Sequence, residues 1–187
     1  LTVMAPSGGS ASRIILIGLG EAERIDDLGA QNFGGRAWKS VASTGQKSAM
    51  VAIDPIKGSK LDTSELAANV AYGARLGSYR FDKYRTREKE GVKPSVTTLT
   101  FASRDPTNAK KSYSPLGKVA DCVFLTRDLV SEPANVIYPI SLAQQVRSLS
   151  RLGFKVTVLD EKQMAKLNMG ALLGVAQGSA NKPRLAV

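Results

Sequence analysis

Short apolar runs alternate with segments of helical periodicity along this chain, and this alternation constrains the fold more than any other feature. The apolar runs have the length and composition of strands; they occupy residues 13–19, 49–53, 96–101 and 154–159. Helical periodicity and helix-capping residues mark residues 35–44, 66–77, 114–131, 142–149 and 160–168. Strands that alternate with helices are typical of α/β proteins, so we predict the α/β class.

The helix predicted over 66–77 is amphipathic and carries small residues on its apolar stripe. Leu66, Val70, Gly73, Ala74 and Gly77 recur at i, i+4, i+7, i+8 and i+11, and polar residues at 62–64 are candidate caps. Small side chains allow a helix to lie close to a neighbouring sheet.

The helix predicted over 114–131 carries two apolar stripes instead of one. One stripe includes Val119 and Val123, and the other includes Leu125 and Leu129. A helix that is apolar on two sides is expected to be buried on two sides, so Leu125→Asp should cost several kcal/mol. We predict a loop over 103–114 before it. We therefore divide the chain into an amino-terminal domain (1–113), a linker helix (114–132) and the beginning of a further domain (133–187).

Composition excludes several kinds of site. The 187 residues contain no histidine and a single cysteine, Cys122. Catalytic arrangements that need an imidazole, histidine-rich zinc sites and disulfides within the chain are therefore excluded. No apolar run is long enough to span a membrane, and the first residues do not resemble a secretory signal. With a single thiol, a reducing, cytoplasmic setting is the expectation. Because there is no initiator methionine, we also expect the chain to begin inside a longer product.

Positive charge is concentrated in one segment. Residues 75–118 contain 11 Lys and Arg against 4 Asp and Glu, which gives +7 of the net +10. A solvated surface explains such a segment, and so does a binding site for DNA or another polyanion. The candidate polyanion-binding residues are Arg80, Lys83, Arg85, Arg87, Lys89 and Lys93.

Two glycine-containing motifs resemble nucleotide-binding loops only in part. Gly18 and Gly20 follow a predicted strand, but Glu23 occupies the place of the third small residue of a dinucleotide fingerprint. The sequence GQKS at 45–48 lies between a predicted helix and a strand, the reverse of the order in a phosphate-binding loop. We interpret both motifs as turns, and we assign no residue to catalysis, to a metal or to a cofactor.

Five segments in register resemble the leucine aminopeptidase family, whose members are also called cytosol aminopeptidases. Each segment alone is modest evidence, but their common order along the chain is specific. The segments are IGLGE (17–21), LGSYRFDKY (76–84), TRDLVSEPAN (126–135), LDEKQM (159–164) and MGALLGVAQGS (169–179).

The resemblance implies a macro-like amino-terminal domain, a linker helix and the first part of an α/β catalytic domain. It further implies a leucyl aminopeptidase that binds two divalent metals, zinc or manganese, acts on peptide substrates and assembles as a homo-hexamer. The family's metal ligands lie in motifs of the type Gly-Lys-Gly, Asp-Ser-Gly-Gly and Asn-Thr-Asp-Ala-Glu-Gly-Arg, which are absent from this sequence. We therefore expect this chain to be inactive alone and to bind no metal. A polyanion-binding module is the alternative, and a freestanding nucleotide-binding domain is disfavoured because residues 154–187 belong to another domain.

Overall fold

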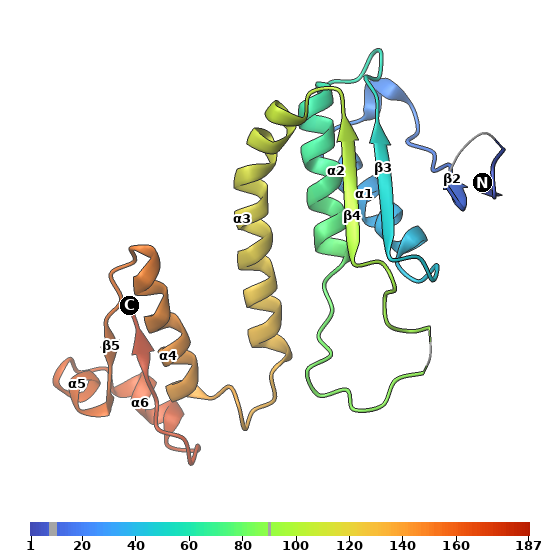
Figure 1. Cartoon of the computed structure of the whole chain (residues 1–187). Coiled ribbons are helices and arrows are strands. Elements are labelled where there is room, and N and C mark those ends of the chain that lie inside the picture. The colour runs from blue at the N-terminus through green and yellow to red at the C-terminus, as the bar shows by residue number, and fades with distance from the viewer. Residues whose placement is uncertain (8–10, 90) are drawn as a thin grey trace. The chain divides into compact units, whose positions relative to one another are not determined.

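A computed structural model describes residues 1–7, 11–89 and 91–187 of the chain (Figure 1). Its residues separate into two compact units, Leu1–Arg127 and Asp128–Val187. We call these the first unit and the second unit, and we consider each by itself.

The first unit contains strands, helices and one 3₁₀ turn. In chain order these are β1 (Thr2–Met4), β2 (Arg13–Ile15), η1 (Ala22–Arg24), α1 (Asp27–Val41), β3 (Ser48–Ile53), α2 (Thr63–Gly77), β4 (Thr98–Ser103) and α3 (Pro106–Ser131), whose last residues belong to the second unit. The chain has the α/β composition that the sequence predicts.

Strands β3 and β4 pair in parallel, from Ser48 opposite Thr98 to Ile53 opposite Ser103. Residues of alternating burial along both strands place one face toward helices α1 and α2. The core of the unit forms there from six buried residues: Ile25, Ala30, Ile53, Leu66, Ala67 and Val70.

Helices α1 and α2 approach each other closely because each has a glycine at the contact. A methyl group added to Gly73 would collide with the carbonyl oxygen of Gln31, and one added to Gly34 would lie 2.8 Å from the backbone nitrogen of Ala74. The buried amide of Asn69 lies in the same contact and accepts a hydrogen bond from Gln31 Nε2 at 2.8 Å. The pair of helices is therefore fixed by backbone-to-backbone packing as well as by apolar burial.

The prediction for α2 is confirmed. The helix begins at Thr63, after Asp62, whose carboxylate accepts hydrogen bonds from the backbone nitrogens of Ser64 and Glu65 at 2.7 and 2.8 Å. The side chain of Glu65 accepts in return from the backbone nitrogen of Asp62 at 3.1 Å, which completes a capping box.

The prediction for residues 13–19 is wrong in length and in burial. Strand β2 ends at Ile15 and pairs antiparallel with β1, a strand that the sequence did not indicate. Leu16 is 58% exposed, so the run is not a buried central strand. Apolar composition alone does not reveal whether a neighbouring layer covers a strand.

The helix predicted over 35–44 begins eight residues earlier, at Asp27. The carboxylate of Asp26 accepts a hydrogen bond from the backbone nitrogen of Gly29 at 2.8 Å and caps the helix. The glycines of this segment weaken the helical pattern in the sequence, but Gly34 is required by the close contact with α2.

Helix α3 corrects two expectations. It is continuous over the predicted range, but it begins at Pro106 and therefore includes most of the segment 103–114 that we expected to be a loop. Leu125 is 42% exposed and Val119 is also exposed, whereas the buried residues of α3 are Gly117 and Ala120. The prediction of burial on two sides is therefore wrong, and the reason for expecting a large cost of Leu125→Asp is lost with it. The buried surface of α3 is therefore a narrow strip that contains the small residues Gly117 and Ala120.

The second unit is smaller and consists of short elements. They are α4 (Pro139–Ser148), η2 (Leu149–Leu152), β5 (Val158–Leu159), α5 (Glu161–Lys166), α6 (Gly170–Ala176) and β6 (Leu185–Ala186). Strands β5 and β6 pair antiparallel. The predicted capping box of α5 is confirmed, because the side chains of Asp160 and Gln163 each accept a hydrogen bond from the other residue's backbone nitrogen at 2.9 Å.

Two predictions for the second unit need correction. The strand expected over 154–159 is limited to β5, and helix α6 lies in a glycine-rich segment that we did not assign to a helix. In the part of the chain that the structure describes, no helix is both long and apolar enough to cross a membrane.

Candidate functional site

The predicted polyanion-binding residues lie on the loop of residues 78–97, which connects α2 to β4 (Figure 1). At its carboxyl-terminal end, the backbone nitrogen of Ser95 donates to the carbonyl oxygen of Ala42 at 2.7 Å, and the Ser95 hydroxyl accepts from the backbone nitrogen of Gly45 at 2.9 Å. These bonds attach the loop to the turn between α1 and β3. Gly45 has a φ of 84° in this turn, in agreement with our interpretation of the GQKS sequence.

Arg80 differs from the other candidate residues because its guanidinium points into the loop. Its Nε lies 3.1 Å from Asp82 Oδ2, its Nη1 donates to the carbonyl oxygen of Val92 at 3.1 Å, and it forms an ion pair with Glu88. Only 22% of the Arg80 side chain is exposed. Arg80 therefore organises the loop and is not available to an external partner.

The remaining candidate side chains are on the surface of this loop. Lys83 lies over the ring of Tyr84, with Nζ 5.4 Å from the ring centroid, and Arg85 Nη1 lies 3.4 Å from a carboxylate oxygen of Glu88. The exposed candidates are Lys83, Arg85, Arg87, Lys89 and Lys93. Exposed cations on one loop can neutralise several phosphates of a polyanion at once.

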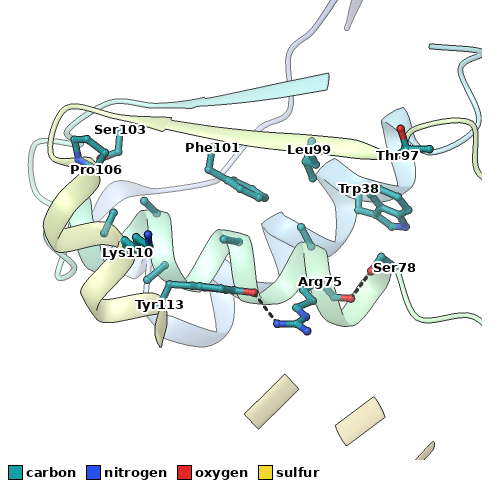
Figure 2. Close-up of a pocket in the computed structure, with 15 residues that line it drawn as sticks. Trp38, Arg75, Ser78, Thr97, Leu99, Phe101, Ser103, Pro106, Lys110 and Tyr113 are labelled. Atoms are coloured by element: carbon teal, nitrogen blue, oxygen red, sulfur yellow. Dashed lines mark hydrogen bonds between the residues drawn. The ribbon is translucent and has the colours of Figure 1, made fainter. Parts of the chain in front are cut away.

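A cavity of about 530 Å³ lies between α2, β4 and α3 (Figure 2). The short side chains of four alanines of α2, at 67, 68, 71 and 74, leave room for the cavity. Trp38, Leu99 and Phe101 add apolar surface to its lining. The sequence showed small residues on α2, but it could not show that the neighbouring side chains leave the groove open.

Arg75 is at one side of this cavity and joins α2 to α3. Its Nη1 donates to the Tyr113 hydroxyl at 3.4 Å (Figure 2). The same nitrogen donates to the carbonyl oxygen of Gly117 at 3.3 Å, and Nη2 forms an ion pair with Asp121. The hydrogen bond to Tyr113, together with the Asp121 carboxylate, raises the pKa of Arg75. The cluster fixes the two helices, and it leaves Arg75 few free donors.

The described residues do not fit a dinuclear metal site. Among residues 1–7, 11–89 and 91–187, no group of three or more His, Cys, Asp or Glu side chains converges in a way that could hold a metal ion. Asp121, one of the two carboxylates on α3, forms an ion pair with Arg75. We derive no catalytic step from these residues.

The structure thus combines a first α/β unit with a parallel strand pair and a second unit of short helices with an antiparallel strand pair. Residues 1–88 match the sequence model "Cytosol aminopeptidase family, N-terminal domain", and residues 124–187 match "Cytosol aminopeptidase family, catalytic domain". The chain belongs to the cytosol aminopeptidase family.

Relatives match the chain over its whole length. A "Probable cytosol aminopeptidase" of Caulobacter vibrioides is 39% identical over 187 residues, which are 100% of this chain and 36% of the relative. A protein of the same description from a Chelativorans species is 42% identical over 185 residues, which are 98% of this chain and 37% of the relative. This chain therefore spans little more than a third of the length of these relatives.

Solved structures of similar fold have related descriptions. A mutant of tomato leucine aminopeptidase superposes with a TM-score of 0.82 at 26% identity, over 100% of this chain and 37% of the other. The bottromycin maturation enzyme BotP in complex with Mn superposes with a TM-score of 0.81 at 25% identity, over 100% of this chain and 38% of that one. These similarities agree with an amino-terminal domain followed by the start of a catalytic domain.

Proposed function

We propose that this chain supplies the amino-terminal domain, the linker helix and the beginning of the catalytic domain of a metal-dependent leucyl aminopeptidase. The observation that carries this proposal is the match of two domain models of one family, in order, over 1–88 and 124–187. We place the domains at 1–113, 114–132 and 133–187. The substrates would be peptides with Leu or another apolar residue at the amino terminus.

The complete enzyme would bind two divalent metals, zinc or manganese, and assemble as a homo-hexamer in the cytoplasm. The manganese in the related BotP structure supports a divalent metal. Such a metal pair supplies an activated water and stabilises the developing oxyanion. The residues that the structure describes would support the catalytic domain but would not ligate the metals.

A chimera tests this proposal with a positive result. The segment of the Caulobacter vibrioides relative that aligns with this chain is replaced by the 187 residues of the chain. We expect the chimera to hydrolyse leucine p-nitroanilide with manganese within about tenfold of the unmodified relative, because a tenfold loss is only about 1.4 kcal/mol of transition-state stabilisation.

The matched control is the relative with the same segment deleted, which we expect to be inactive. A chimera that is folded, has the oligomeric size of the relative and binds manganese, yet turns over no faster than the deletion variant, contradicts the proposal.

A second candidate function is weak binding of DNA without sequence preference. The observation that favours it is the set of exposed cations on the loop of residues 78–97. Replacement of Lys83, Arg85, Arg87 and Lys89 by serine is expected to remove most of the binding.

The dependence of affinity on salt measures this interaction. Fluorescence anisotropy with duplex DNA should give a log–log slope of about −0.9 for each phosphate neutralised. A slope near zero contradicts DNA binding by this loop. So does a variant with all four serine substitutions that binds as well as the unmodified chain.

A further inference from the structure

The described residues of the loop 78–97 contact one another through their side chains, although they form no helix or strand. Loops longer than about 12 to 15 residues without regular structure are uncommon, and they usually either have a function or are disordered. Compact surface loops whose side chains pack within the loop frequently have a function.

The contacts of Arg80 close this loop. The guanidinium joins Asp82, Glu88 and the carbonyl oxygen of Val92, so one side chain connects points up to 12 positions apart in sequence. The side chains of Arg80 and Glu88 are only 22% and 19% exposed. A half-buried pair of this kind holds its geometry better than a surface pair, because the loss of either partner leaves the other charge poorly solvated.

Exposed cations lie on both sides of Glu88 in the sequence. Arg87 and Lys89 are its neighbours, and Arg85 contacts the same carboxylate at 3.4 Å. The position of Glu88 therefore fixes where these cations are presented. A binding site that is already arranged loses less conformational freedom when a partner binds.

We propose that the Arg80–Glu88 pair is a clasp that holds Lys83, Arg85, Arg87 and Lys89 as a preformed site for the phosphodiester backbone of duplex DNA. The proposal rests on the DNA binding proposed above and assigns different roles within it. Arg80 and Glu88 are positioning residues, and the exposed cations are the contact residues.

The effect of one substitution on DNA affinity distinguishes a clasp from simple electrostatics, because the two predict changes of opposite sign. Glu88→Gln removes a negative charge from the middle of a basic loop. If only charge matters, this variant binds DNA more tightly. If the clasp matters, it binds more weakly although its net charge is more positive. Glu23→Gln makes the same change of charge on η1 and is the matched control.

The experiment measures anisotropy of a labelled DNA duplex with the full chain at several salt concentrations. We expect Glu88→Gln to weaken binding by at least about threefold through lost preorganisation, and to reduce the salt slope by about 0.9, one phosphate contact. Glu23→Gln should bind at least as tightly as the unmodified chain. Arg80→Lys keeps the charge but loses the planar fork that joins several acceptors, and it should also weaken binding.

Trypsin digestion of the same proteins reports on the clasp directly. We expect faster cleavage at Arg85, Arg87 and Lys89 in Glu88→Gln and Arg80→Lys than in Glu23→Gln. Tighter DNA binding by Glu88→Gln, or unchanged binding by Arg80→Lys, overturns the clasp. If the unmodified chain binds no DNA even at low salt, the proposed DNA binding is wrong, and so is the role of the clasp in it. Faster trypsin cleavage of Glu88→Gln and Arg80→Lys would then show that the clasp has only a structural role.

Discussion

Gly73→Ala is expected to lower the thermal midpoint of the first unit by about 10 °C. The added methyl group would collide with the carbonyl oxygen of Gln31 on α1, and backbone atoms cannot rotate away as a flexible side chain can. Helices α1 and α2 would have to separate, which would open the core around Val70. Overpacking usually costs about 1 to 3 kcal/mol, and a clash with backbone atoms belongs at the upper end of this range. Each kcal/mol corresponds to about 2 to 4 °C in a chain of this length.

Gly35→Ala is the matched control on the facing helix. A methyl group there would lie 3.7 Å from the carbonyl oxygen of Gly73, an ordinary contact. Because alanine favours the helix over glycine by up to about 1 kcal/mol, we expect a midpoint that is unchanged or slightly higher. Circular dichroism during heating measures both variants. A Gly73→Ala chain as stable as the control would show that the two helices do not pack as described.

Helix α2 was predictable because its signals are local. The capping residues Asp62 and Glu65 and the apolar stripe from Leu66 all lie within a few turns of one another. Helix α1 was not predicted from its start, because its glycines are unfavourable for an isolated helix. The reason for Gly34 is tertiary, since only the backbone of α2 explains why a side chain is excluded there.

The start of α3 was missed although the sequence contained a signal for it. Pro106 occupies the first helical position, where proline is favoured. The carboxylate of Asp105 accepts a hydrogen bond from the backbone nitrogen of Asn108 at 3.0 Å, and this bond lowers the pKa of Asp105. Polar composition suggested a loop, whereas the aspartate–proline pair was a helix start.

The location of the basic loop could be predicted from sequence, but the division of roles within it could not. Arg80 and Lys83 have equal charge in a linear sequence. Only the fold of the loop brings Arg80 onto Glu88 and onto the carbonyl oxygen of Val92. The cavity beside Arg75 depends in the same way on where three separate elements meet.

The chain alone is expected neither to hydrolyse leucine p-nitroanilide nor to bind manganese tightly. Hydrolysis by a metal pair needs several ligands arranged around two ions about 3.5 to 4 Å apart. Within the described residues, no three acidic, cysteine or histidine side chains converge in this way. Family membership and activity of this chain are therefore separate questions.

Calorimetric titration of the 187-residue chain with manganese, with turnover measured in the same sample, tests whether these residues contain a metal centre. Circular dichroism first establishes that the sample is folded, and intact mass confirms 19.9 kDa. We expect no saturable manganese binding and no hydrolysis above a blank. Two stoichiometric manganese sites, with turnover that a chelator abolishes, would contradict this expectation and place a complete metal centre within these residues.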